Sequence, residues 1–276
     1  MRTTTWDDLL LPGNAADFFA RQSFPSFELN ATGYNRGNAR WLMELSRLVY
    51  RHDREEDNPP PQPARTRFLA NAGYTQRKFF RSDDTDTQAM LVESTRPTPH
   101  TILVFRGTEQ NSGDLATDLD IWQNFLHGLA AASSMADTNS AYVHEGFKQA
   151  LNSVWDEIAA ELSGLGNVPL FYTGHSLGAA LATLAATRHA PKAIYTFGSP
   201  RVGNQAFART LAGIPIYRVV DDEDIVATQP PDWLGFVHVG VTHLLKEAPE
   251  DVLLSHLSVP PKSLADHAPV NYLDRI

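Results

Sequence analysis

The stretch FYTGHSLGAALATLAA, residues 171–186, places Ser176 between Gly174 and Gly178, where a short apolar run gives way to small residues. The apolar run predicts a strand, and the alanines predict a helix that packs close to it, so the serine lies on a sharp strand–turn–helix connection. Such a turn presents the serine in a strained conformation at the carboxyl end of a sheet, and the flanking glycines avoid collisions within it. Ser176 is therefore predicted to be a nucleophile, which requires a base held against its hydroxyl.

Two backbone N–H groups are candidates for stabilising the negative charge that develops on a substrate oxygen. The first belongs to Leu177, at the amino end of the predicted helix, where N–H groups are free and the helix dipole is positive. The second is expected on a loop after an earlier strand, and HTILVFRGTE at 100–109 supplies one. There Gly107 allows close backbone approach, and Thr108 offers both an N–H and a hydroxyl. The alternative is a strand-ending turn with a hydrogen-bonded threonine.

Strands and helices alternate with short links on both sides of the serine, which requires right-handed crossovers and a parallel sheet. The predicted fold class is α/β, with a mostly parallel central sheet flanked by helices. The length suits a single domain over residues 1–276. Strands are predicted at 87–94, 100–107, 168–173, 192–198, 214–220 and 236–241, and helices at 38–50, 147–162, 177–189, 204–212 and, weakly, 271–276.

In this architecture an acid and then a histidine follow the serine along the chain. Acidic residues come directly after the predicted strand at 214–220, where such a site places its acid, and spacing leaves the choice open among Asp221, Asp222, Glu223 and Asp224. Three of the four are expected to form a solvated turn.

Four histidines follow the acidic run. His238 alternates within a predicted strand and is interpreted as structural, whereas His243 and His256 remain alternatives for the base. His267 lies in a polar turn near the end of the chain, where a base reaches over the sheet edge. No pair of these histidines has a spacing that favours a metal site.

From about Asn38 to its end, the chain resembles the class 3 lipase family, the fungal-type triacylglycerol lipases and their bacterial relatives. The pentapeptide G-x-S-x-G alone arises by chance in roughly one chain in ten to twenty of this length, so the ordered set of motifs is far more specific. The motifs are NARWLMELSRLVYR (38–51), VFRGTE (104–109), VHEGF (143–147), YTGHSLGAALATLAA (172–186), TFGSPRVGN (196–204), YRVVDDEDIVATQPP (217–231), FVHVG (236–240) and ADHAPVNYL (265–273).

The resemblance implies an α/β-hydrolase fold and an esterase that works through a serine triad and an acyl-enzyme, without a cofactor. It selects Asp224 as the acid and His267 as the base for the nucleophile Ser176, with Thr108 and Leu177 as the oxyanion hole. The sequence departs from the usual family pattern in two places: Ala227 follows the Asp-Ile-Val motif where proline is usual, and Ala179 stands where many relatives have glycine.

A candidate lid is expected at 109–136, where relatives carry a movable segment and where apolar residues are interspersed with polar ones. An amphipathic helix there would cover the acyl groove in water and turn its apolar face to a lipid–water interface. A helix docked permanently on the core is the alternative.

The composition restricts the classes of partner that the chain is expected to bind. The net charge of −9 argues against a nucleic-acid surface and against strong attraction to anionic lipid headgroups. Apolar runs are too short for a membrane span or a Sec signal. With no cysteine there is no disulfide. These features favour a cytoplasmic location, with non-Sec secretion or a shortened chain as alternatives.

The expected substrate is an acyl ester, and a triacylglycerol lipase or esterase is the function that the resemblance favours. The same triad would serve a phospholipase A1, a feruloyl esterase or a polyester hydrolase. A catalytically silent lipid-binding module on the same fold is the alternative from a different class. The sequence does not indicate the oligomeric state.

Overall fold

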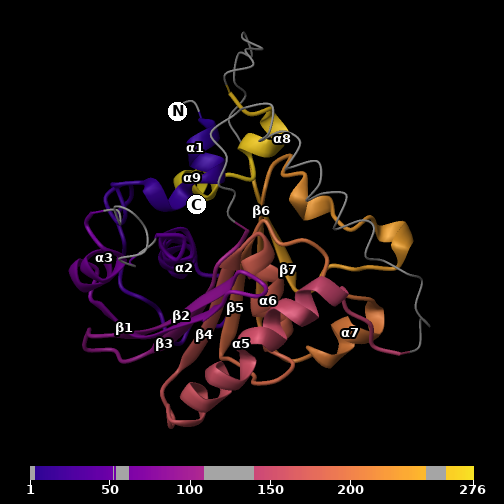
Figure 1. Ribbon diagram of the computed structural model, residues 1–276, viewed down its shortest axis with the longest axis horizontal. Coiled ribbons are helices and arrows are strands. Elements are labelled where there is room, and N and C mark those ends of the chain that lie inside the picture. Colours follow the sequence, from indigo (N-terminus) through magenta and orange to yellow (C-terminus); the bar gives the residue numbers. More distant parts are fainter. Residues whose placement is uncertain (1–3, 52, 54–61, 109–139, 247–258) are drawn as a thin grey trace.

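The computed structural model describes residues 4–51, 53, 62–108, 140–246 and 259–276 (Figure 1). Within these residues, seven strands form one sheet in the order of the chain. The first three strands pair antiparallel and the rest pair parallel, from β3 to β7. The strands are β1 (Tyr74–Ser82), β2 (Thr87–Ser94), β3 (Thr101–Phe105), β4 (Leu170–His175), β5 (Ala193–Phe197), β6 (Ile216–Asp221) and β7 (Val241–Leu245).

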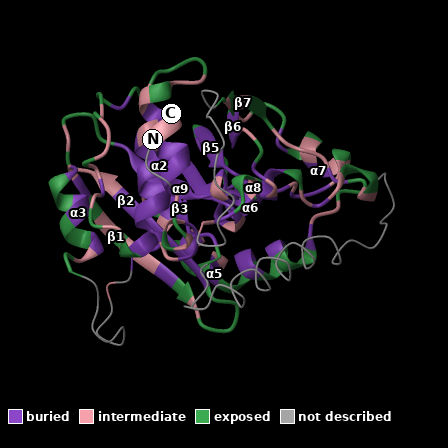
Figure 2. Ribbon diagram, turned by 90° about the horizontal axis from the view of Figure 1, so that it is seen from above, coloured by how far each residue is buried: buried purple, intermediate pink, exposed green. Residues whose placement is uncertain are grey.

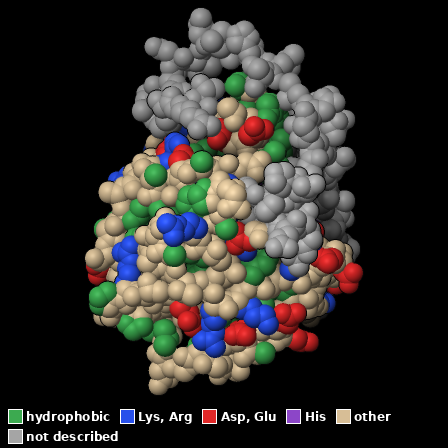
Figure 3. Space-filling model, turned by 60° about the vertical axis from the view of Figure 1, so that its left-hand side comes forward, with side chains coloured by type: hydrophobic (Ala, Val, Ile, Leu, Met, Phe, Trp, Pro, Cys, Tyr) green, Lys and Arg blue, Asp and Glu red, His purple; other side chains and the backbone are tan. Residues whose placement is uncertain are grey.

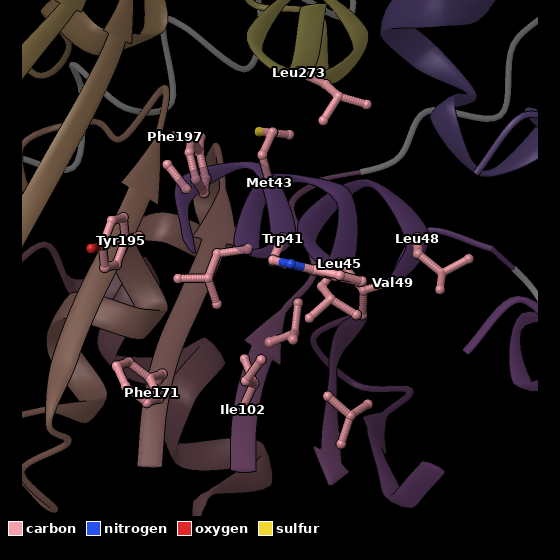
Figure 4. Close-up of a cluster of buried hydrophobic side chains, with 14 of the residues drawn as sticks. Trp41, Met43, Leu45, Leu48, Val49, Ile102, Phe171, Tyr195, Phe197 and Leu273 are labelled. Carbon is pink, nitrogen blue, oxygen red and sulfur yellow. The ribbon is translucent and has the colours of Figure 1, made fainter. Parts of the chain in front are cut away.

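Helices cover both faces of the sheet because the strand residues alternate between two apolar layers. In β4, Phe171 packs in the cluster that contains α2, whereas Tyr172 packs in the cluster that contains α5 and α6. Figure 4 shows labelled side chains of α2 against those of β3, β4 and β5. The helices are α1 (Trp6–Leu10), α2 (Arg36–Leu48), α3 (Arg65–Asn71), α5 (Glu145–Ser163), α6 (Leu177–Ala185), α7 (Gln205–Thr210), α8 (Lys262–Ala265) and α9 (Pro269–Arg275).

A third, smaller cluster joins segments that are far apart in the chain. It contains Leu9 and Leu10 of α1, Val226 from a short 3-10 turn (Val226–Thr228), Leu264 of α8 and Val270 of α9. This cluster holds the last part of the chain beside the segment that follows β6. Figure 2 shows buried residues along the centre of the molecule and exposed ones on the peripheral loops and helices.

The α/β prediction and the mostly parallel sheet are confirmed. The strand predicted at 87–94 has the observed bounds, and the helices predicted at 38–50 and 147–162 lie within two residues of α2 and α5 at each end. The strand predicted at 236–241 is wrong: there Val237 forms only an isolated bridge, and the edge strand β7 begins at Val241.

Gly240 explains why no continuous strand forms at 236–241. Its φ of +91° breaks the extended backbone between the bridge at Val237 and the start of β7 at Val241. A side chain at this position would also collide with Ile216, since a built Cβ lies 2.5 Å from the Ile216 carbonyl oxygen. Alternating hydrophobicity in the sequence does not reveal this turn.

The described surface carries mixed charges. On the face drawn in Figure 3, acidic and basic side chains of the described residues are interspersed, and apolar side chains occur in small groups. Of the helices in the described part of the chain, none has the length and apolar character needed to cross a bilayer.

Candidate active site

Ser176 occupies a tight turn between β4 and α6. Its φ of 58° and ψ of −128° lie in a region that residues other than glycine rarely adopt, and its N–H donates to the Phe197 carbonyl oxygen at 2.9 Å. A Cβ built on Gly174 would lie 2.3 Å from the backbone of Gly178, and one on Gly178 would lie 2.2 Å from the Phe105 carbonyl oxygen. Both glycines are therefore sterically required, as the sequence predicts.

Asp224 and His267 meet although 43 residues separate them. His267 Nδ1 lies 2.9 and 2.8 Å from the two carboxylate oxygens of Asp224, and both side chains are almost fully buried. Asp224 also accepts hydrogen bonds from the Val226 N–H at 2.8 Å and from the Tyr272 hydroxyl at 2.5 Å. The Ala227 N–H also donates to this carboxylate, at 3.4 Å, and together these contacts hold it in a single orientation.

Burial alone would raise the pKa of Asp224. The charge of His267 and the hydrogen bonds from His267 and Tyr272 outweigh burial, so the pKa of this carboxyl is lowered from its ordinary value. Asp224 therefore stays ionised at neutral pH, in the state that orients an imidazole.

His267 lies beside the end of β4, the strand that leads to Ser176. The rings of His175 and His267 are 4.5 Å apart between centroids, and His175 Nε2 is 2.8 Å from the main-chain oxygen of His267. Because His175 immediately precedes Ser176, this contact ties the base to the residue next to the serine. The structure thus brings Asp224, His267 and the Ser176 turn to one edge of the sheet.

Thr108 and Leu177 also lie at this edge. Thr108 is exposed and follows β3 by three residues, and Leu177 is the first residue of α6. The built Cβ of Gly178 is 2.9 Å from the carbonyl carbon of Arg106, so the chain that leads to Thr108 packs directly on the start of α6. The oxyanion role of the two residues remains a prediction.

The structure distinguishes among the four acids between which the sequence spacing did not decide. Asp221 is buried and forms an ion pair with Arg275; burial raises its pKa to about 7. Asp222 pairs with Lys262 at 2.6 Å, and the Glu223 N–H donates to Asp266. Of these four acids, Asp224 is the one that contacts His267.

The other histidine candidates lie elsewhere or are not described. His243 is on β7 and stacks on Tyr34, with 3.9 Å between ring centroids. Burial and neighbouring arginines lower the pKa of His238 to about 3, which fits its structural interpretation. His256 and the candidate lid at 109–136 fall outside the described residues. Among the described residues there is no cluster of side chains that could hold a metal ion.

Sequence reasoning missed Tyr272, Tyr50 and His175. Tyr272 lies on α9, and its oxygen accepts the Asp221 N–H at 3.1 Å while its hydroxyl donates to Asp224. Tyr50 lies 3.1 Å from His175 Nδ1. All three residues fall within quoted motifs, but no periodicity indicates contacts between segments so far apart.

Mild acid is expected to destabilise the fold through His175, because burial lowers the pKa of this histidine from 6.5 to about 3. Between these values the unfolded chain binds a proton that the folded chain does not, so stability falls as pH falls. The loss is about 1.4 kcal/mol per pH unit between roughly pH 6 and pH 4. Urea unfolding at several pH values measures it. His175→Gln should show a correspondingly shallower dependence, and equal slopes for the two proteins would refute the assignment.

Comparison with known proteins links this site to one family. Residues 102–233 match the family model described as Lipase (class 3). The lipase of Rhizopus niveus is 34% identical over 197 residues, which are 62% of this chain and 47% of that relative. The chain spans about half the length of the curated relatives that it matches.

Solved structures give the same result. The lipase from Rhizopus microsporus var. chinensis is 26% identical, with a TM-score of 0.59 over 90% of this chain and 91% of that one. A triacylglycerol lipase whose catalytic centre is described as a serine protease triad is also 26% identical. Its TM-score is 0.50, over 64% of this chain and 69% of that one.

Proposed function

We propose that this chain, whose residues 102–233 match the model of the class 3 lipase family and whose sheet is that of an α/β hydrolase, is a serine carboxylic-ester hydrolase of the triacylglycerol lipase type. One observation carries the proposal. The buried Asp224–His267 pair is bonded through the His267 main chain to His175, next to a serine in a strained turn. The lipases to which the chain is similar support the ester class.

The proposed reaction begins with proton transfer from the Ser176 hydroxyl to Nε2 of His267 as the serine oxygen attacks the ester carbonyl. Asp224 accepts the Nδ1–H of His267, which fixes the tautomer in which Nε2 carries no hydrogen and accepts that proton. The N–H groups of Thr108 and Leu177 bind the oxyanion of the tetrahedral intermediate.

Collapse of this intermediate breaks the bond to the alcohol, which leaves with the proton from His267. Ser176 then carries the acyl group as an ester. Water, deprotonated by His267, attacks the acyl-enzyme and releases the carboxylic acid, which restores the serine hydroxyl. Asp224 remains ionised throughout and stabilises the imidazolium in both halves of the reaction.

Covalent labelling combined with an ester panel tests the proposal. An activated alkyl phosphonate should modify Ser176 stoichiometrically, as peptide mass spectrometry would detect, because an activated serine alone reacts at a useful rate. p-Nitrophenyl esters of short, medium and long acyl chains, together with emulsified triacylglycerol, should be hydrolysed. Turnover of phospholipid or feruloyl ester in preference to triacylglycerol would reassign the substrate. If the protein is not labelled and hydrolyses none of these esters, the remaining interpretation is a catalytically silent lipid-binding module.

A further inference from the structure

His175 uses both ring nitrogens inside the protein. Its Nε2 lies 2.8 Å from the main-chain oxygen of His267, and its Nδ1 lies 3.1 Å from the Tyr50 hydroxyl. The side chain is buried, and the residue immediately precedes Ser176. One partner, Tyr50, comes before β4 in the chain, and the other, His267, comes after it. The proposed reaction assigns no chemical step to this residue.

The partners fix which nitrogen carries the proton. A carbonyl oxygen only accepts hydrogen bonds, so Nε2 must carry the hydrogen that it shares with His267. Burial and the nearby His267 lower the pKa of His175 to about 3, so the ring is neutral and Nδ1 is a bare acceptor. Tyr50 therefore donates to Nδ1. The hydrogen bonds run in one direction, from Tyr50 through the ring of His175 to the backbone of His267.

Tyr50 in turn lies against the chain that leads to Thr108. A Cβ built on Gly107 would be 2.0 Å from the Tyr50 hydroxyl oxygen, so this hydroxyl fills the space that a side chain would occupy. The same Cβ would be 2.7 Å from the carbonyl oxygen of His175. The chain that leads to Thr108 thus packs at Gly107 against both Tyr50 and His175. These two residues connect it to the base, His267.

We propose that His175, supported by Tyr50, is a positioning residue that holds the main chain of His267 at the distance from Ser176 that proton transfer requires. The inference rests on the proposed function. Asp224 fixes the rotation of the His267 ring through Nδ1, whereas His175 fixes the backbone from which that ring extends. The base is then held at two points, and one of them is the residue adjacent to the nucleophile. Displacing a reacting group by about 1 Å costs about 100-fold in rate.

His175→Phe tests the proposal, since it keeps an aromatic ring against His267 but removes both nitrogens. The expected result is a fall in kcat of about 10- to 100-fold on a p-nitrophenyl ester, with KM within about twofold. His175→Gln should recover part of the loss, because its side-chain amide donates to the same carbonyl oxygen. Tyr50→Phe should lower kcat by a few-fold, since His175 keeps its bond to His267. Rates are divided by the number of phosphonate-titrated serines, so unfolded protein does not count.

A matched pair at the opposite end of the sheet separates positioning from stability. The Tyr74 hydroxyl lies 3.0 Å from His100 Nε2, and His100 Nδ1 lies 2.9 Å from a backbone oxygen, with both side chains buried. His100→Phe and Tyr74→Phe should lower Tm to a similar extent but leave kcat per titrated serine unchanged.

Each outcome decides one question. If His175→Phe and His175→Gln keep wild-type kcat per titrated serine, the positioning role is overturned. If His175→Phe does not fold, Tyr50→Phe decides: a kcat equal to that of Tyr74→Phe overturns it, and a selective fall supports it. If the wild-type protein itself neither reacts with phosphonate nor hydrolyses esters, the proposed function fails instead.

Discussion

Replacing Ser176 with alanine is expected to lower kcat for ester hydrolysis by about 10⁶-fold, the scale of loss when a triad loses its nucleophile. The remaining groups bind and polarise the ester but have no oxygen to acylate. The fold should be retained, because alanine adds no atom to a turn already closed by Gly174 and Gly178. Initial rates with a p-nitrophenyl ester measure the loss, and phosphonate labelling should disappear with them.

Ser46→Ala is the matched control for that substitution. Ser46 is another buried serine, on α2, whose hydroxyl donates to the Leu42 carbonyl oxygen at 2.7 Å and contacts Thr173 at 3.1 Å. Loss of this hydroxyl should reduce the free energy of unfolding by about 1 kcal/mol and leave kcat unchanged. A Ser176→Ala protein that retains a tenth of wild-type kcat would exclude Ser176 as the nucleophile.

Asp224→Asn should lower kcat by about 10⁴-fold without altering the size of the side chain. Asparagine presents an NH₂ group where the carboxylate accepts the Nδ1–H of His267, so the imidazole adopts the other tautomer. Its Nε2 then carries a hydrogen and does not accept the serine proton. The Tyr272 hydroxyl loses an ionised acceptor at the same time. The change is measured as kcat at neutral pH, with circular dichroism to verify the fold.

Asp221→Asn provides the comparison, because Asp221 is a buried carboxyl three residues earlier that pairs with Arg275 rather than His267. Burial raises its pKa to about 7, so the neutral asparagine resembles a state that the wild-type side chain already populates near neutral pH. We expect kcat within a few-fold of wild type. If Asp221→Asn proves as damaging as Asp224→Asn, the acid has been assigned to the wrong residue.

The turn around Ser176 is predictable from the sequence because its requirements are local. Glycines at fixed offsets and a run of alanines follow from steric limits within a few residues, and the structure places Gly174 and Gly178 in the predicted collision positions. The parallel sheet also follows from the local alternation of strands and helices.

Local sequence does not identify the acid and the base of the site. Four consecutive acids and four histidines satisfied the spacing, and the family resemblance selected Asp224 and His267. Their contact depends on the packing of α8 and α9 against the segment after β6, through the cluster of Leu264 and Val270 with Val226. The network of Tyr50 and His175 likewise joins three distant segments, and no local pattern specifies such contacts.

The parallel pairing of β4, β5 and β6 bears on redesign. Backbone hydrogen bonds set the register of these strands, so the sheet fixes the strand ends from which the Ser176 turn and the segment leading to Asp224 begin. A loop graft at this rim that spares the segments carrying Asp224 and His267 would therefore change the shape offered to an incoming molecule while the reacting groups stay in place. The residues that select the substrate can then be varied separately from those that perform the reaction. The fold is therefore a suitable scaffold for libraries of loop variants.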